Sequence, residues 1–266
     1  MDWVIEGSGG EAIHGTTQEA VGGCRGNVVI SHGFKGYKDY GMFPWIATSL
    51  ARGGMRVHRF NFSHSGMLGE DGPFERPDLF ERDTWNRQVE DLIAVCDHVD
   101  GGGPLTLLGH SRGGVACLLA AGRGVVVPRG IITLSSPSTC NALDEETQQT
   151  LLRSGFIESP SSRTGQMLRI GAPFLQEQID DPAGHDLLPL VATIPCPIAV
   201  IHGEDDPTVP VTSAENIAAA AQCATVTRIP GGDHVFNTPN PFPRDGSPSP
   251  QLAAVLAAIR QSLGSK

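Results

Sequence analysis

The segment GHSRGG contains a serine, Ser111, whose hydroxyl group could act as a nucleophile. A short apolar run at 105–108 precedes it, and a segment of small apolar residues typical of a helix follows it. A sharp turn between a strand and a helix lifts a serine side chain above the carboxyl edge of a sheet. Gly109, Gly113 and Gly114 permit such a turn and close packing of the helix. The pattern predicts a nucleophile, with an incidental serine in a tight turn as the alternative.

A serine nucleophile needs a base, and the base needs a carboxylate that orients it. His234 follows the candidate strand 224–229 in PGGDHVF, and Asp206 follows the apolar run 197–202 in GEDDPTVP. Because the carboxyl ends of parallel strands meet at one edge of a sheet, both residues should lie near Ser111. Taken singly, an Asp-Pro is usually a turn and a loop histidine is usually solvated. Their joint placement instead predicts a Ser-His-Asp triad.

The acid of this triad has four candidates, Glu204, Asp205, Asp206 and Asp233. Asp233 is unsuitable because it is adjacent to the histidine, and adjacent side chains in an extended segment diverge. Pro207 restricts Asp206 to an extended conformation, which would project its carboxylate rigidly. We therefore predict Asp206 as the acid, with the other two residues of the loop as alternatives.

The segment HGFKG, which follows the apolar run 27–31, could complete the site. An acyl-transfer enzyme must stabilise the negative oxygen of its tetrahedral intermediate, and fixed backbone amides do this well. Gly33 would let the loop fold close to the serine, so that the amide of Phe34 can join that of Arg112 in an oxyanion hole. The alternative is that HG in this position is only a turn.

The elements that must position these residues alternate between short apolar runs and amphipathic segments. Strands are expected at 27–31, 55–60, 105–108, 130–134, 197–202 and 224–229, with a possible antiparallel hairpin before about Gly15. Helical spacing of apolar residues covers 85–99 and 252–263. This alternation predicts an α/β fold whose mostly parallel sheet is covered by helices on both faces.

One connection, 137–196, is much longer than an ordinary crossover between strands. Helical pieces are expected within it at 144–153 and 164–178. Because long insertions are often lids or binding loops, we predict a core domain of 1–136 and 197–266 with 137–196 as a small cap. A helical decoration that does not contact substrate is the alternative. Apolar side chains of the cap that could shape a pocket are Phe156, Met167, Phe174 and Leu175.

Composition narrows the possible partners and compartment. The formal net charge of -10 disfavours nucleic acid, because phosphate binding depends on concentrated Lys and Arg. No secretion signal or membrane helix is expected, and six scattered cysteines without a CxxC pair suggest reduced thiols in a cytoplasmic protein. His32, His202 and His234 lack the spacing of a zinc site, and His202 is expected to be a packing residue. We expect a monomer or homodimer without metal.

The ordered set SHGFKG, NFSHSG, GHSRGG, GEDDPTVP and GGDH resembles the α/β-hydrolase family, especially bacterial esterases of the feruloyl or cinnamoyl type and serine-aminopeptidase-like hydrolases. The resemblance covers nearly the whole chain. It implies an eight-stranded, mostly parallel sheet, a cap after the sixth strand, Ser111 as nucleophile, His234 as general base and Asp206 as acid. The family pattern of Asp followed by Pro-x-Val agrees with that acid. The sequence departs from many relatives in NFSHSG, at Asn61, Ser63 and Ser65.

These observations predict a cofactor-independent serine hydrolase that cleaves carboxylic esters of small to medium size through an acyl-enzyme on Ser111. A thioesterase, an amidase or a peptidase would use the same triad and remains an alternative. A non-catalytic ligand-binding protein of this fold is less favoured, because all three triad members are present. The residues expected to contact the substrate are Gly33, His110, Met167, Phe174 and Val209.

Overall fold

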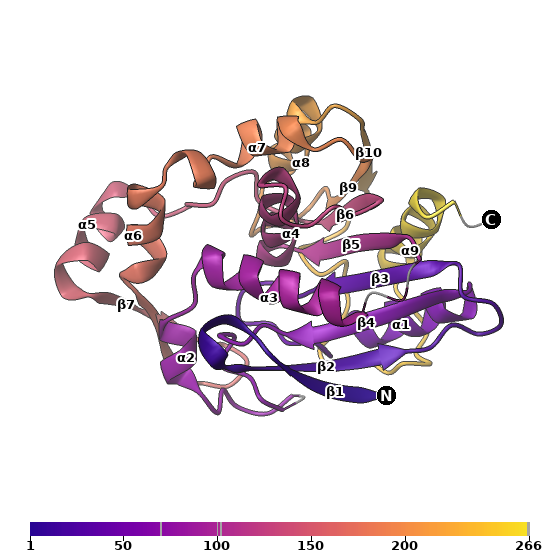
Figure 1. Cartoon of the computed structure of the whole chain (residues 1–266), viewed down its shortest axis with the longest axis horizontal. Coiled ribbons are helices and arrows are strands. Elements are labelled where there is room, and N and C mark those ends of the chain that lie inside the picture. Colours follow the sequence, from indigo (N-terminus) through magenta and orange to yellow (C-terminus); the bar gives the residue numbers. More distant parts are fainter. Residues whose placement is uncertain (70, 100, 102, 265–266) are drawn as a thin grey trace.

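In the computed structural model, described for residues 1–69, 71–99, 101 and 103–264, an eight-stranded sheet runs through the molecule (Figure 1). The strands in chain order are β1 (Asp2–Glu6), β2 (Ala12–Gln18), β3 (Gly26–Ser31), β4 (Met55–Asn61), β5 (Leu105–His110), β6 (Gly130–Leu134), β9 (Ile198–Gly203) and β10 (Ala224–Ile229). Their spatial order is β1-β2-β4-β3-β5-β6-β9-β10. The pairs β1·β2 and β2·β4 are antiparallel, and the other neighbours are parallel. The mostly parallel eight-stranded sheet predicted from the sequence is confirmed.

Helices cover both faces of the sheet (Figure 1). One face carries α3 (Trp85–Val99), α4 (Arg112–Gly122), α7 (Leu187–Thr193) and α8 (Thr212–Ala220), and the other carries α1 (Phe43–Arg52) and α9 (Pro250–Ser262). Successive side chains of a strand point to opposite faces. Accordingly, Val29 and Leu107 pack in the first core, whereas Ile30 and Leu108 pack in the second. Burial on both faces explains why these strands are continuous apolar runs.

The insertion 137–196 contains both helices and strands. Its elements are α5 (Glu145–Ser154), β7 (Phe156–Pro160), β8 (Met167–Gly171), α6 (Pro173–Asp180), the short 3-10 helix η2 (Ala183–His185) and α7. The helix expected at 144–153 is confirmed, but the continuous helix expected at 164–178 is wrong. Its first half is β8, which pairs antiparallel with β7, and α6 begins only at Pro173. A proline is well tolerated in the first turn of a helix but disrupts a helix interior, so it separates the two elements.

The insertion packs against the rest of the chain at both of its ends. Leu168 of β8 is buried against Phe74 and Phe80, which flank or lie in α2 (Pro77–Glu81). At its other end, α7 packs against α4 and α8, so the last part of 137–196 joins the helical layer on the sheet. The division of the chain into core and cap stays a prediction. In Figure 1, α2, α5, α6 and β7 lie on the side toward which the arrowheads of β4 and β5 point.

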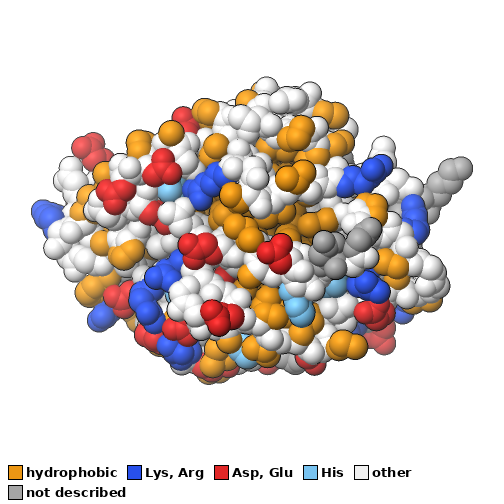
Figure 2. Space-filling model, viewed as in Figure 1, with side chains coloured by type: hydrophobic (Ala, Val, Ile, Leu, Met, Phe, Trp, Pro, Cys, Tyr) orange, Lys and Arg blue, Asp and Glu red, His pale blue; other side chains and the backbone are white. Residues whose placement is uncertain are grey.

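On the face drawn in Figure 2, acidic and basic side chains are interspersed. Among the helices of the described residues, none is long and apolar enough to cross a membrane. The six cysteines all lie within the described residues and are all unpaired, and Cys96, Cys117, Cys140 and Cys196 are buried. A further 3-10 turn, η1 (Ser8–Gly10), connects β1 and β2.

Buried histidines should make the fold sensitive to acid. Burial lowers the pKa of His32, His58 and His64 to about 4 and that of His110 to about 3. In the unfolded chain these side chains bind protons below a pH of about 6.5, so falling pH favours unfolding between about 6.5 and 4. Burial has the opposite effect on two carboxyl groups, since it raises the pKa of Asp83 to about 6 and of Asp91 to about 7.

The four histidines favour unfolding as the pH falls, and the two carboxyl groups oppose it. Because the histidines are more numerous, we expect the free energy of unfolding to fall by on the order of several kcal/mol from pH 6.5 to pH 4. Urea denaturation at a series of pH values measures this. A free energy of unfolding that stays constant or rises over this interval would contradict the expectation.

Candidate active site

Ser111 lies in the turn between β5 and α4, with a φ of 52° and a ψ of −124°. A positive φ is uncommon for a residue other than glycine, and such strain gathers at functional sites. Two neighbouring glycines make the turn possible through close packing. A Cβ on Gly113 would lie 2.3 Å from the carbonyl oxygen of Ser31, and one on Gly114 would lie 1.8 Å from Oγ of Ser136. Larger residues could not start the helix here.

Asp206 lies in the loop after β9, and its carboxylate is completely buried. Its Oδ2 is 2.8 Å from Nδ1 of His234, and its Oδ1 accepts hydrogen bonds from the amides of Thr208 and Val209 at 2.8 and 2.9 Å. Burial alone would raise the pKa of Asp206, but hydrogen bonds from His202, His234 and Val209 hold it well below its ordinary value. The carboxylate is therefore ionised and fixed next to the imidazole.

The other acidic candidates lie apart from this contact. Glu204 and Asp205 are exposed to solvent. Oδ1 of Asp233 accepts hydrogen bonds from the amides of Val235 and Asn237 at 2.9 and 2.7 Å, so this carboxylate stabilises its own turn. Of the four acids considered from the sequence, the structure brings Asp206 into contact with the histidine.

His202 takes part in the site in a way that the sequence did not indicate. Its side chain is fully buried, and its Nε2 lies 2.9 Å from the carbonyl oxygen of Val209 and 3.5 Å from Oδ2 of Asp206. The carbonyl oxygen of Val209 and the ionised carboxylate of Asp206 can only accept hydrogen bonds. Nε2 of His202 must therefore carry the proton. His202 thus helps to hold the carboxylate as well as packing at the end of β9. The only sequence signal was its position four residues before Asp206.

His110 supports the loop that carries His234. Its Nε2 donates a hydrogen bond to the carbonyl oxygen of His234 at 2.8 Å, and the two rings lie 4.8 Å apart. Burial, and next the charge of His234, lower the pKa of His110 to about 3, so its ring is neutral near pH 7. His110 therefore fixes the backbone of His234 while its own ring stays uncharged.

The loop HGFKG packs directly against the serine. A Cβ on Gly33 would lie 3.0 Å from Cβ of Ser111. The ring of His32 holds the loop, since its Nε2 accepts a hydrogen bond from the amide of Phe62 and its Nδ1 donates to the carbonyl oxygen of Gly33. Within the described residues, the backbone amides of Phe34 and Arg112 have no protein acceptor. Both amides are therefore available as hydrogen-bond donors.

The side chain of Arg112 lies among three aromatic rings. Its Cζ is 4.4 Å from the ring centre of Trp85, 4.7 Å from that of Phe174 and 5.5 Å from that of Phe34. Its Nη2 is 3.1 Å from Oδ2 of Asp83. The side chain therefore anchors the start of α4 to α3 and α6.

A pocket of about 230 Å³ contains Ser111, His234, His110 and Gly33 in its lining. The remaining walls come from Phe34–Gly36, Tyr40, Phe43, Val235 and the turn 160–163 between β7 and β8. Larger hollows of about 680 and 560 Å³ include the amino ends of β5 and β6, at the opposite edge of the sheet. The smaller pocket is therefore the one next to Ser111 and His234.

Of the five residues expected to contact substrate, the structure brings Gly33 and His110 into this pocket. The other three lie outside its lining. Met167 is 55% exposed on β8, the ring of Phe174 packs on Arg112, and Val209 holds the carboxylate of Asp206. The insertion contributes to the pocket wall through the turn 160–163 instead. The composition of this turn is that of an ordinary loop, so the sequence did not indicate a contact with substrate.

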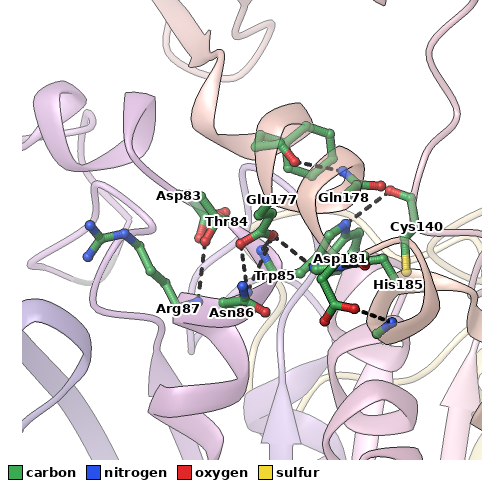
Figure 3. A network of polar contacts seen from close by, with 12 residues as sticks. Asp83, Thr84, Trp85, Asn86, Arg87, Cys140, Glu177, Gln178, Asp181 and His185 are labelled. Carbon is green, nitrogen blue, oxygen red and sulfur yellow. Dashed lines mark hydrogen bonds and ion pairs between the residues drawn. The ribbon is translucent and has the colours of Figure 1, made fainter.

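A polar network attaches the insertion to the core (Figure 3). Oε1 of Glu177, on α6, accepts a hydrogen bond from the amide of Trp85 at 2.6 Å, and its Oε2 accepts one from the amide of Asn86 at 3.3 Å. Glu177 Oε1 also lies 3.5 Å from Nε2 of His185. In addition, Nε1 of Trp85 donates to the carbonyl oxygen of Cys140 at 3.0 Å. Glu177 thus caps the start of α3 from a distant part of the chain.

Replacing Glu177 with alanine should therefore destabilise the fold by about 1–2 kcal/mol, because the capped amides of α3 lose their acceptor. Gln176→Ala is the matched control, since its exposed side chain donates its hydrogen bond to Asp180 on the same helix. We expect the control to change stability by less than about 0.5 kcal/mol in urea denaturation. Equal losses in the two variants would show that Glu177 does not anchor the insertion.

Comparisons with known proteins agree with this architecture. The model of the Alpha/beta hydrolase family matches residues 28–244. Among curated proteins, none matches the sequence. The structure of Est1E from Butyrivibrio proteoclasticus with ferulic acid bound is similar, with 18% identity, a TM-score of 0.74 and coverage of 98% of this chain and 96% of that chain.

Two further solved structures show the same fold at low identity. Alpha/beta hydrolase domain-containing protein 10 from mouse has 20% identity and a TM-score of 0.73, with 99% of this chain and 98% of that chain covered. The monoacylglycerol lipase of Paleococcus ferrophilus has 14% identity and a TM-score of 0.70, with 94% and 98% covered. From the extent of the family match, the chain belongs to the alpha/beta hydrolase family.

Proposed function

We propose that the protein is a serine hydrolase that cleaves carboxylic esters of small to medium size through an acyl-enzyme on Ser111. One observation carries this proposal. Ser111, on a strained turn, and His234, whose Nδ1 is 2.8 Å from the buried carboxylate of Asp206, line the same pocket. The similar structures of Est1E with ferulic acid and of a monoacylglycerol lipase support ester chemistry.

In the proposed reaction, Oγ of Ser111 attacks the ester carbonyl while Nε2 of His234 takes its proton. The carboxylate of Asp206 accepts the hydrogen bond of Nδ1 and stabilises the imidazolium. The amides of Phe34 and Arg112 donate to the oxyanion. When the intermediate collapses, the carbon–oxygen bond to the alcohol breaks and His234 gives its proton to the leaving alkoxide, which leaves an acyl group on Ser111.

Deacylation repeats these steps with water. His234 takes a proton from water as the water oxygen attacks the acyl carbonyl, and the proton returns to Oγ of Ser111 when the acid leaves. The pocket of about 230 Å³ is smaller than most ligand sites, which span about 300–1,000 Å³. This size favours substrates with a short acyl or alcohol part.

A hydrolysis panel tests this function. The panel contains 4-nitrophenyl esters of increasing acyl length, a thioester and a 4-nitroanilide with the same short acyl group. We expect short-chain esters to have the highest kcat/KM. With activated 4-nitrophenyl esters, whose acylation outpaces deacylation, a burst of 4-nitrophenol equal to the amount of enzyme should come first, because acylation releases the alcohol. Absence of ester turnover would contradict the proposal. A higher kcat/KM for the thioester or the anilide would reassign the reaction to one of those classes.

A further inference from the structure

The pocket beside Ser111 is basic in an acidic protein. The chain has 29 Asp and Glu against 19 Lys and Arg, with a net charge of -10. The pocket lining nevertheless includes Lys35 and Arg163, and no aspartate or glutamate of the described part of the chain lines it. Two cations without a carboxylate in so small a lining indicate that the pocket favours a negatively charged group.

Lys35 connects the loop beside the serine to the turn of the insertion. It has a φ of 57°, which is uncommon for lysine. Its Nζ donates a hydrogen bond to the carbonyl oxygen of Pro160 at 2.7 Å. An ammonium group has three N–H donors, so this contact leaves two for a ligand. Partial burial lowers the pKa of Lys35, in keeping with its position at the pocket wall.

Arg163 is held rigidly by neutral groups. Its Cζ lies 5.0 Å from the ring centre of Tyr37 and 5.1 Å from that of Phe74. Its Nη1 donates to the carbonyl oxygens of Asp71 and Gly72 at 3.0 and 2.7 Å, and its buried Nε has no hydrogen-bond partner among the described residues. Its Nη2 also contacts Sδ of Met67 at 3.3 Å. Because these contacts are with residues outside the pocket lining, Arg163 adds positive charge beside the pocket rather than a free donor within it.

We propose that this pocket takes esters whose acid or alcohol part ends in a carboxylate, which the ammonium group of Lys35 binds while Ser111 attacks the ester carbonyl; the charge of Arg163 beside the pocket adds to the attraction. An ammonium group forms strong charge-assisted hydrogen bonds with carboxylates. The inference rests on the proposed function, because it names the substrate class of the same site.

Two substrate pairs that differ in one carboxylate test the inference. Monoethyl adipate and ethyl hexanoate differ at the end of the acid part, and 4-acetoxybutyrate and butyl acetate differ at the end of the alcohol part. We expect kcat/KM for the anionic ester to exceed that for its neutral partner by about tenfold or more in at least one pair. Added salt should lower this ratio, because it screens the cations.

Variants then assign the preference to the pocket. The ratio should fall toward one in Lys35→Met and be largely retained in Lys35→Arg, because arginine keeps the charge. Using a ratio cancels any common effect of losing the contact with Pro160. The matched control is Arg153→Met, which removes an exposed cation of α5 and should leave the ratio as in the wild type. A ratio that falls as far in Arg153→Met as in Lys35→Met would show that only overall charge matters.

Binding to the Ser111→Ala protein separates this inference from the proposed function. In calorimetric titrations, adipate should bind more tightly than its neutral diamide, and Lys35→Met should weaken adipate binding by about fivefold or more. If neutral esters are hydrolysed but both ratios equal one and adipate binds no better than the diamide, the carboxylate inference is wrong and the esterase proposal stands. If no ester is hydrolysed, the proposed function is wrong, and the titration still decides whether the pocket binds carboxylates.

Discussion

Replacing Ser111 with alanine should abolish ester turnover while leaving the fold intact. Without Oγ no acyl-enzyme can form, and loss of a triad nucleophile typically lowers kcat by several orders of magnitude. The remaining activity should be below about one per cent of wild type, measured as kcat/KM on a short-chain ester. The free energy of unfolding should change little, because a serine-to-alanine change removes only one hydroxyl from a turn.

Ser138→Ala is the matched control for this variant. Ser138 lies in the loop after β6, and its side chain contacts Asn216 rather than the pocket. It should hydrolyse esters at nearly the wild-type rate. If Ser111→Ala in a pure preparation kept more than about one per cent of the activity, Ser111 would not be the nucleophile.

Replacing Asp206 with asparagine should give the second largest effect, a fall in kcat of about 10⁴-fold with little change in overall structure. The ionised carboxylate accepts the hydrogen bond of His234 Nδ1, and its pKa lies well below the ordinary value, so it stays charged across the working pH range. An amide lacks the charge that stabilises the imidazolium, and its NH₂ group favours the wrong tautomer of the ring.

Asp205→Asn provides the control, because it makes the same chemical change on an exposed neighbour in the same loop. Its kcat should stay within a few-fold of wild type. The triad assignment would have to move by one residue if Asp205→Asn were the crippled variant and Asp206→Asn were nearly normal.

Much of the fold was predictable because strands and helices of this class have strong local signals. The candidate strands 130–134 and 224–229 coincide with β6 and β10, since each segment is followed by residues that favour turns. The three triad candidates could be located for the same reason. Each follows a strand, and parallel strands bring their carboxyl ends to one edge of the sheet.

The insertion was not predictable to the same extent, because long-range pairing overrides its local pattern. The segment 164–178 has apolar residues at helical spacing, but pairing with β7 makes 167–171 a strand. That strand leaves Met167 exposed and buries Leu168. The turn 160–163 then reaches the pocket. Its position depends on where the β7–β8 hairpin packs against the core, and the composition of the turn does not encode this. The contact of His202 with Asp206 likewise depends on how a loop folds back.

Covalent labelling tests the central claim most directly. The protein is incubated with a fluorophosphonate, which reacts with an activated serine in place of an ester, and its peptides are analysed by mass spectrometry. We predict one adduct per chain, on Ser111, which is absent in Ser111→Ala and forms much more slowly in Asp206→Asn. Absence of labelling, or an adduct on another residue that persists in Ser111→Ala, would contradict the account.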